Sequence, residues 1–221
     1  MKPNLTIAIP KGRILSELSD YFAQIGFEPE ADFYDDKSRK LIFESNFANL
    51  KIIKVRSFDV ATFVKFGAAD FGICGLDVLQ EFSCPDIYPF FDLQLGKCRL
   101  SIAAKKGHDA DIFDQSPKSH VRIASKYLNL TNKFFSARGI QAECIKLNGA
   151  MELAPNLNLC DYIVDLVSTG NTLRENGLAE IEKIMDVSSY FVVNRQSFKT
   201  KGRDLLQMAQ MFDNAKLIRG C

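Results

Sequence analysis

The chain has 221 residues, with 28 basic and 27 acidic side chains and a formal net charge of +1 at pH 7. This balance gives no electrostatic reason to expect nucleic-acid binding, and the apolar runs are far shorter than the ~20 residues that a membrane span needs. The N-terminal apolar run is also too short for a secretory signal. Six cysteines without a CxxC pair fit free thiols in a reducing compartment, so we expect a cytoplasmic protein.

Strands and helices alternate in the first half of the chain. Leu5–Pro10 has the pattern of a buried strand, and apolar residues three or four apart then predict a helix that ends at Gly26. The next expected elements are paired strands at Leu41–Glu44 and Lys51–Val55, a helix from a Ser57 cap to about Gly67, a strand at Phe71–Cys74 and a helix at Gly75–Phe82. Two separate strands follow, at Asp86–Leu93 and Lys97–Ala104.

A second series of strands and helices follows the polar stretch Lys105–His120, which we expect to be a loop. Its expected members are a strand at Val121–Ala124, a helix around Thr131–Arg138, strands at Ala142–Lys146 and Tyr162–Val167, a helix carrying Leu173, Leu178, Ile181 and Ile184 near one face, a strand at Ile184–Asn194 and a helix at Asp204–Phe212. This alternation predicts the α/β class, with mixed sheets flanked by helices.

The chain is expected to cross twice between two lobes, near Leu93–Lys97 and near Ala179–Asp186. Domain I is then discontinuous, with residues 1–93 plus 180–221, and domain II contains residues 94–179. A ligand cleft between two such lobes is a common arrangement in proteins of this class.

The segment DYIVDLVSTGNTLRENGL, residues 161–178, carries the strongest chemical signal. Its apolar strand feeds a short turn of five residues, Ser168, Thr169, Gly170, Asn171 and Thr172, and a helix start follows. Hydroxyls and free N–H groups at such a turn can donate to one dianion, and Gly170 allows close approach. Because the lysine of a P-loop and the spaced glycines of a dinucleotide fold are missing, the turn favours a small phosphate monoester. An ordinary capped helix start would give the same local pattern.

Asp165 is a second chemical signal in this segment, because a carboxylate inside IVDLV is costly to bury without a partner or a ligand cleft. Six further segments accompany this one in the chain: AIPKGRIL (8–15), SRKLIF (38–43), VRSFDVATFVKFGAADFGICGLDVL (55–79), GKCRL (96–100), RIASKYLNLT (122–131) and IKLNGAMELAP (145–155).

In this order and combination the segments resemble the catalytic subunit of ATP phosphoribosyltransferase, the first enzyme of histidine biosynthesis. The resemblance covers most of residues 5–195. It implies a two-lobed fold like that of type II periplasmic binding proteins, with the active site in the cleft between the lobes. It also implies that ATP and 5-phosphoribosyl-1-pyrophosphate (PRPP), with substrate-bound Mg²⁺, give N1-(5-phosphoribosyl)-ATP and pyrophosphate.

The resemblance assigns substrate-binding roles in the second lobe. The turn at residues 168–172 resembles the loop that grips the ribose 5′-phosphate, and Glu152 and Asp165 resemble the acids near the ribose hydroxyls. The sequence departs from the family at Ser168, where an acid is frequent. A hydroxyl can still donate to phosphate, but a role for an acid at that position does not carry over.

Arg13 and Arg39 resemble the family's catalytic arginines, which face pyrophosphate and the ATP phosphates, and Lys11 is expected to join them. Guanidinium groups suit this role because they pair bidentately with phosphate oxygens. The adenine N1 lone pair is free at neutral pH, so the reaction needs no strong base. No metal site formed by protein side chains is expected.

Two other classes of protein compete with this interpretation. A solute-binding protein of the same fold would bind a ligand without turnover, although the absence of an export signal argues against it. A phosphoribosyltransferase of the salvage type would carry two adjacent acids before its Thr/Gly turn, whereas here only Asp165 lies inside the strand.

The catalytic resemblance ends near Asn194, which leaves about one helix and a tail. That length is too short for a separate histidine-binding domain, so the chain resembles the short form of the family. We therefore expect a homodimer that joins a regulatory subunit similar to histidyl-tRNA synthetase. An unregulated, stand-alone dimer is the alternative.

Overall fold

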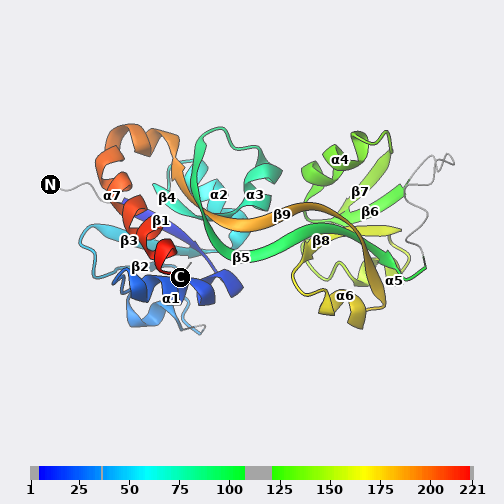
Figure 1. The fold of residues 1–221 in the computed structure, drawn as a ribbon, viewed down its shortest axis with the longest axis horizontal. Helices are drawn as coiled ribbons and strands as arrows, with labels where there is room; N and C mark the ends of the chain where they lie inside the picture. The colour runs from blue at the N-terminus through cyan, green and yellow to red at the C-terminus, as the bar shows by residue number, and fades with distance from the viewer. Residues whose placement is uncertain (1–4, 36, 108–120, 220–221) are drawn as a thin grey trace. The chain divides into compact units, whose positions relative to one another are not determined.

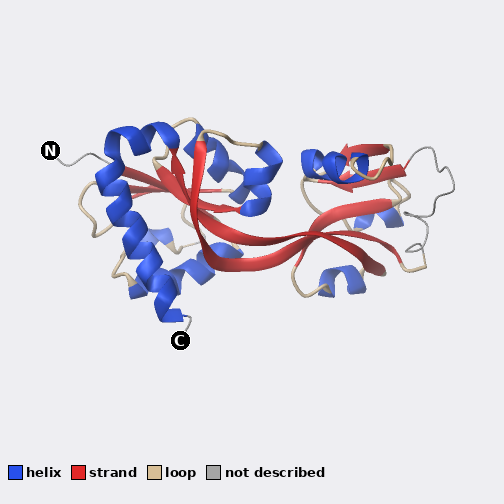
Figure 2. Cartoon of the chain, turned by 45° about the horizontal axis from the view of Figure 1, so that its top comes forward, coloured by secondary structure: helices blue, strands red, loops and turns tan. Residues whose placement is uncertain are grey.

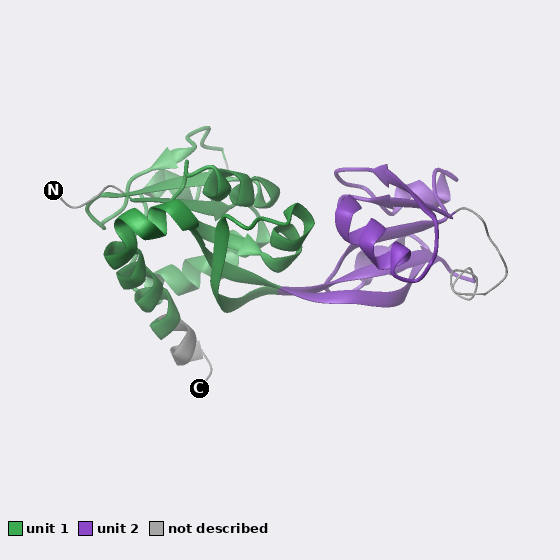
Figure 3. Ribbon diagram, turned by 90° about the horizontal axis from the view of Figure 1, so that it is seen from above, with its two compact units in different colours: residues 1–96, 188–221 green, residues 97–187 purple. Residues whose placement is uncertain are grey.

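The structure, a computed structural model, describes residues 5–35, 37–107 and 121–219, with side chains described as far as residue 214. Most of the loop expected at Lys105–His120 therefore lies outside the described residues. The chain divides into two compact units, of which unit 1 contains residues 1–96 and 188–221 and unit 2 contains residues 97–187 (Figure 3). No helix within the described residues is long and apolar enough to cross a bilayer.

Unit 1 contains a mixed sheet built around three parallel strands (Figure 1). The strands β2 (Ile42–Phe43), β3 (Leu50–Val55), β1 (Leu5–Pro10), β4 (Phe71–Gly75) and β9 (Leu178–Asn194) follow one another in that spatial order. The edge strand β2 runs antiparallel to β3, with Ile42 opposite Ile53, which matches the paired strands expected from the sequence. β9 runs antiparallel to β4.

Helices cover both faces of the unit 1 sheet because its strands alternate apolar side chains between the two sides (Figure 2). Ile7 and Ile9 of β1 pack with the buried faces of α1 (Arg13–Gln24) and α7 (Arg195–Arg219). Ala8, between them, packs with residues of α2 (Ser57–Lys65) and α3 (Leu76–Phe82). The unit also contains a single 3-10 turn, η1 (Ala31–Phe33), among its described residues.

Unit 2 is a smaller mixed sheet with strand order β5, β8, β6, β7. Its elements are β5 (Ile87–Lys105), β6 (Val121–Ser125), α4 (Leu128–Ser136), β7 (Ala142–Lys146), α5 (Leu153–Asn156), β8 (Tyr162–Val167) and α6 (Asn171–Glu175). β6 is parallel to β7 and β8, whereas β5 is antiparallel to β8. Apolar residues of α5 and α6 pack on one face of this sheet.

Three expectations about elements are wrong. Asp86–Leu93 and Lys97–Ala104 form one strand, β5, in which positive φ angles at Gln94 and Gly96 mark an interruption that does not end the strand. The helix expected to reach Ile184 stops at Glu175. Gly177, at φ 73°, turns the chain into β9 there, so Leu178, Ile181 and Ile184 belong to a strand. Ser57 is the first residue of α2, and the cap position belongs to Arg56.

The divisions between the units lie at residues 96/97 and 187/188, whereas the sequence places them at 93/94 and 179/180. The larger difference falls within β9, which continues from Leu178 to Asn194. A continuous strand offers no turn residue from which a boundary can be read in the sequence.

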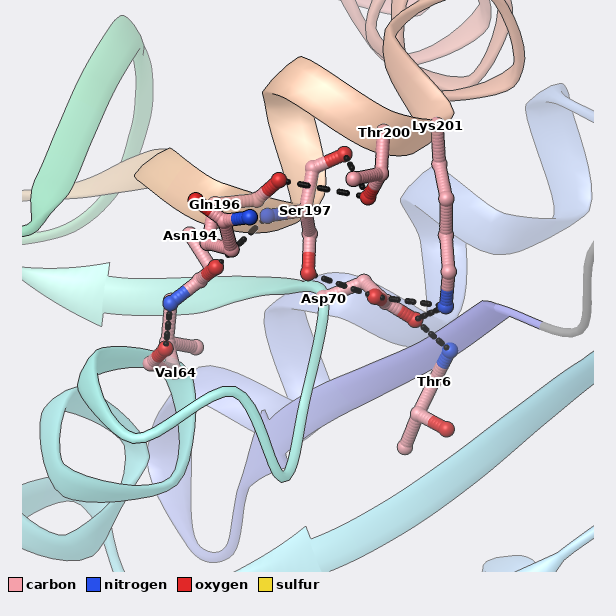
Figure 4. Close-up of polar contacts among 8 residues, drawn as sticks. All are labelled: Thr6, Val64, Asp70, Asn194, Gln196, Ser197, Thr200 and Lys201. Carbon is pink, nitrogen blue, oxygen red and sulfur yellow. Dashed lines mark hydrogen bonds and ion pairs between the residues drawn. The ribbon is translucent and has the colours of Figure 1, made fainter.

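A buried carboxylate, Asp70, ties the two ends of the unit 1 chain together (Figure 4). It accepts hydrogen bonds from the Thr6 N–H at 2.9 Å and the Ser197 hydroxyl at 2.7 Å, and it pairs with the Lys201 ammonium at 2.8 Å. Lys201 lies where α7 kinks, at φ −126° and ψ 21°. The first strand and the last helix are therefore held by one side chain.

We predict that Asp70→Ala lowers the free energy of unfolding by about 2–4 kcal/mol, because the substitution leaves Lys201 and two other donors without their acceptor. Chemical denaturation of the full chain measures the effect. Asp186→Ala is the control, because Asp186 is 78% exposed in its pair with Lys183, and such a pair contributes about 0–1 kcal/mol. Equal losses in the two variants would contradict the role of Asp70.

Candidate functional site

The turn at residues 168–172 joins β8 to α6, and its last two residues, Asn171 and Thr172, are the first two of that helix. Gly170 occupies the position before the first helical residue at φ 75°, a conformation that favours glycine. The side chains of Ser168, Thr169, Asn171 and Thr172 are exposed. The turn therefore presents hydroxyls beside the N–H groups of a helix start, which is the chemistry that a phosphate requires.

Two arginines hold this turn through its backbone. Arg174 donates to the Thr169 carbonyl at 3.2 Å and also to the Asn171 side-chain oxygen. Arg99, on β5, donates to the Ser168 carbonyl at 3.1 Å. The amide oxygen of Asn171 is thus engaged within the turn, and the Thr169 hydroxyl accepts a hydrogen bond from the Asn171 N–H at 3.4 Å.

Asp165 and Glu152 are the two acids of unit 2 that the sequence assigns to the site. Asp165 is half-buried on β8, and burial raises its pKa from 3.8 to about 6, although the Leu166 N–H donates to it at 2.8 Å. The negative charge of Glu152 raises the same pKa further, and Lys126 lowers it. The structure therefore brings Glu152, Asp165 and Lys126 into electrostatic contact.

Lys11 and Arg13 lie at the carboxyl end of β1 in unit 1, which is the edge where α/β sheets bind ligands. The Lys11 side chain is exposed, and the backbone N–H of Lys11 donates to the Val55 carbonyl at 2.8 Å. Arg13 opens α1, with its side chain 52% exposed. It donates to the Gly96 carbonyl at 3.2 Å, while Glu17 accepts from the Gly96 N–H at 2.7 Å.

Arg39 is exposed in the loop between η1 and β2. Its neighbour Lys40 anchors that loop by an ion pair with Glu30. The structure thus places Lys11, Arg13 and Arg39 in unit 1, and Glu152, Asp165 and the turn at 168–172 in unit 2.

Four basic residues beside these groups were given no functional role from the sequence. Arg56 follows β3 at the same sheet edge as Lys11, because β1 and β3 are parallel with Pro10 opposite Val55. Lys126 follows β6 near Asp165, and Arg99 and Arg174 hold the turn. These residues lie in the segments VRSF, SKYL, GKCRL and TLREN. Arg56 and Lys126 each come directly after a buried strand, and that position is the sequence signal that could have identified them.

Metal ligands are sparse in the described part of the chain. There, no three His, Cys, Asp or Glu side chains converge in a way that could hold a metal ion. The acidic pair of Glu152 and Asp165 offers carboxylate oxygens, which are the ligands that Mg²⁺ prefers, but it is only a pair.

Comparison with known proteins identifies the family. The model of the HisG ATP phosphoribosyltransferase family matches residues 56–214. The chain belongs to the ATP phosphoribosyltransferase family. The enzyme of that name from Rhodospirillum rubrum is 51% identical over 96% of this chain and 92% of its own length, and that from Neisseria gonorrhoeae is 46% identical over 96% and 94%.

Solved structures agree with this membership. An ATP phosphoribosyltransferase (HisG:HisZ) complex from Thermotoga maritima contains a chain that superposes with a TM-score of 0.81 at 31% identity, covering 96% of this chain and 98% of that one. The periplasmic aliphatic sulphonate binding protein SsuA from Escherichia coli gives a TM-score of 0.54 at 13% identity, covering 97% and 69%. The second likeness confirms the periplasmic-binding-protein type of fold and carries no functional meaning.

The family establishes the activity. The chain is a pentosyltransferase that joins ATP to PRPP through adenine N1, giving N1-(5-phosphoribosyl)-ATP and pyrophosphate in the first step of histidine biosynthesis. The salvage-type enzyme and the solute-binding protein considered above are therefore excluded as its function.

We predict that Asp165→Asn changes how stability depends on pH. The pKa of Asp165 in the folded chain, about 6, is higher than its ordinary value of 3.8, so the wild type loses stability as the pH rises through this range. The asparagine variant lacks that loss. Its free energy of unfolding relative to wild type should rise by about 1–2 kcal/mol between pH 4.5 and pH 8.

Urea titrations at the two pH values measure this difference, with the exposed Asp186→Asn as the control. A pH-independent difference between wild type and Asp165→Asn would contradict the raised pKa.

Proposed function

We propose that the turn at residues 168–172 holds the 5′-phosphate of PRPP, with Glu152 and Asp165 accepting hydrogen bonds from the ribose hydroxyls. The observation that carries this proposal is the turn itself, in which exposed hydroxyls lie beside a helix start and Gly170 has a positive φ. Asp165 is two residues before the end of β8, so it is close in the chain to the turn that would hold the phosphate. Ser168 contributes a hydroxyl donor at the position where the family resemblance leads us to expect an acid.

The reaction requires positioning more than acid–base chemistry. Adenine N1 attacks C1′ of the ribose, the bond from C1′ to the pyrophosphate oxygen breaks, and the pyrophosphate leaves with the bonding electrons. Positive charge develops on the sugar and negative charge on the leaving group. Carboxylates at Glu152 and Asp165 suit the cationic sugar, and guanidinium groups suit the anion.

We assign the leaving group and the ATP phosphates to Arg13 and Arg39, with Lys11 beside them. Arg13 and Lys11 lie at the carboxyl edge of the unit 1 sheet. Arg39 is exposed in the loop that precedes β2. Magnesium belongs to this proposal as a substrate ion, because pyrophosphate oxygens and one or two carboxylates are its usual ligands in such enzymes. When bound, it neutralises charge on the departing pyrophosphate.

The assembly is also a proposal. The Thermotoga maritima neighbour is described as a HisG:HisZ complex, which supports a HisZ-type regulatory partner, similar to histidyl-tRNA synthetase, for this chain. We propose a cytoplasmic catalytic homodimer within such a hetero-oligomer. Histidine bound to the partner would then change the affinity or rate at the catalytic site through contacts between chains.

The direct test of the activity mixes the purified chain with ATP, PRPP and Mg²⁺ and follows the ultraviolet absorbance of the adduct and the release of pyrophosphate. Free adenine in place of ATP is the control for a salvage-type reaction. Product with free adenine and none with ATP would contradict the assignment.

We predict that Thr169→Ala with Thr172→Ala raises KM for PRPP much more than KM for ATP. Each lost charge-assisted hydrogen bond contributes roughly 1.5–3 kcal/mol, so the double variant should bind PRPP at least about 100-fold more weakly. Steady-state kinetics with each substrate varied in turn measures this. Thr62→Ala, an exposed threonine on α2, is the matched control. An unchanged KM for PRPP in the double variant means that the turn does not bind the phosphate.

Arg13→Ala and Arg39→Ala are predicted to lower kcat more than they weaken ground-state binding, because their charges oppose charge that develops during bond breaking. Lysine at either position should restore little where two-point contact with phosphate matters. Variants with normal kcat and only a raised KM would reduce these residues to binding contacts.

The isolated chain is predicted to be insensitive to histidine, and addition of the partner should make it sensitive. Inhibition titrations with and without the partner compare the two states. Strong inhibition of the isolated chain by histidine, with a binding site apart from the catalytic one, would contradict regulation through a separate subunit.

A further inference from the structure

The guanidinium group of Arg99 makes one contact with the start of the turn and two with Glu180. Its Nη1 donates to the Ser168 carbonyl at 3.1 Å, and its Nε donates to Glu180 Oε1 at 2.6 Å. The Nη2 group binds the other oxygen of Glu180 at 2.5 Å. One guanidinium group thus makes a two-point ion pair with one partner and a hydrogen bond with the other.

Strand pairing explains why these groups meet. Arg99 on β5 lies opposite Val167, the last residue of β8, so its side chain starts beside Ser168. Glu180 lies on β9. The side chains of Arg99 and Glu180 are only 33% and 26% exposed, and hydrogen bonding by Arg99 lowers the pKa of Glu180, so the pair stays charged at neutral pH.

We infer that Arg99 is a positioning residue, which fixes the peptide at Ser168 and so aims the donors of the turn at the phosphate of PRPP, with Glu180 fixing Arg99. The inference rests on the proposed phosphate-binding role of residues 168–172. The Ser168 carbonyl is the backbone acceptor at the first residue of the turn, and an arginine held at both ends of its fork restricts the rotation of that peptide. Preorganised donors bind an anion more tightly than donors that must first be ordered.

Unit 2 contains a matched control pair. Arg138 binds Glu182 at 2.6 Å, with side chains 37% and 33% exposed, close to the values for Arg99 and Glu180. Glu182 is on the same strand two residues beyond Glu180, so both side chains are on one face of the sheet. Arg138 also donates to the Phe134 carbonyl of α4 and lies over the Phe134 ring.

The test compares Arg99→Lys and Arg138→Lys in the full chain. Lysine keeps the charge but cannot bind Glu180 at two points and reach Ser168 at once. For Arg99→Lys we expect KM for PRPP to rise about 5- to 20-fold, with KM for ATP unchanged and kcat reduced less than the KM is raised. Arg138→Lys should leave all three constants at wild-type values. Calorimetric titration with PRPP in the absence of ATP should repeat the difference in affinity.

Glu180 is tested by a double-mutant cycle. If Glu180 acts only by holding Arg99, then Glu180→Gln should raise KM for PRPP in the same direction as Arg99→Lys, and the double variant should be no worse than the poorer single variant. Full additivity of the two effects would overturn the assigned role of Glu180. Replacement of both residues by methionine leaves neither charge without its partner, so a loss of PRPP affinity in a chain with wild-type melting temperature supports positioning.

Several outcomes would overturn the inference. These are an unchanged KM for PRPP in Arg99→Lys, an equal rise for ATP and PRPP, or the same change in Arg138→Lys. The double threonine variant at positions 169 and 172 separates this failure from failure of the proposed function. If that variant loses PRPP affinity and Arg99→Lys does not, the turn binds phosphate without help from Arg99; if neither loses it, the proposed function itself is wrong.

Discussion

Backbone hydrogen bonding along two long strands is the constraint on which the rest of the structure depends. β5 and β9 each contribute residues to both units, so the chain leaves unit 1 and returns to it within strands rather than through linkers. In unit 1, β9 pairs with β4, and in unit 2, β5 pairs with β8. Because buried N–H and C=O groups must be paired, the strands of neither unit are fully paired without a strand that is shared with the other unit.

This arrangement explains which parts of the fold could be predicted from the sequence. Short buried strands such as β1 and β4 are mainly apolar runs that end in proline or glycine, so their bounds follow from local patterns. The continuity of β5 could not be predicted from the sequence, because the segment around Gln94 and Gly96 resembles a turn. Both residues do have positive φ angles, but the strand continues past them. The short length of α6 could not be predicted either. The spacing of Leu178, Ile181 and Ile184 fits one face of a helix, although these residues belong to β9.

The candidate site divides in the same way. The turn and Asp165 could be predicted because their functional groups belong to residues that are neighbours in the sequence. The raised pKa of Asp165 agrees with the expected cost of burying its charge. Arg99 and Glu180 are 81 residues apart, and only the pairing of β5 with β8 brings Arg99 to Ser168. Contacts of this kind depend on strand register, which a single sequence specifies only through the completed fold.

The discontinuity of unit 1 has a consequence for synthesis on the ribosome. Phe71–Gly75 is made early, but its partners at Ser189–Val193 emerge more than one hundred residues later, as do Ser197 and Lys201, which bind Asp70. Until then β4 has an unpaired, apolar edge, and such edges invite association with other chains. All of unit 2 leaves the ribosome before residues 188–221 can complete unit 1, so the middle segment of the chain has all of its residues first. The N-terminal segment of unit 1 is then the part that is exposed to association with other chains during synthesis.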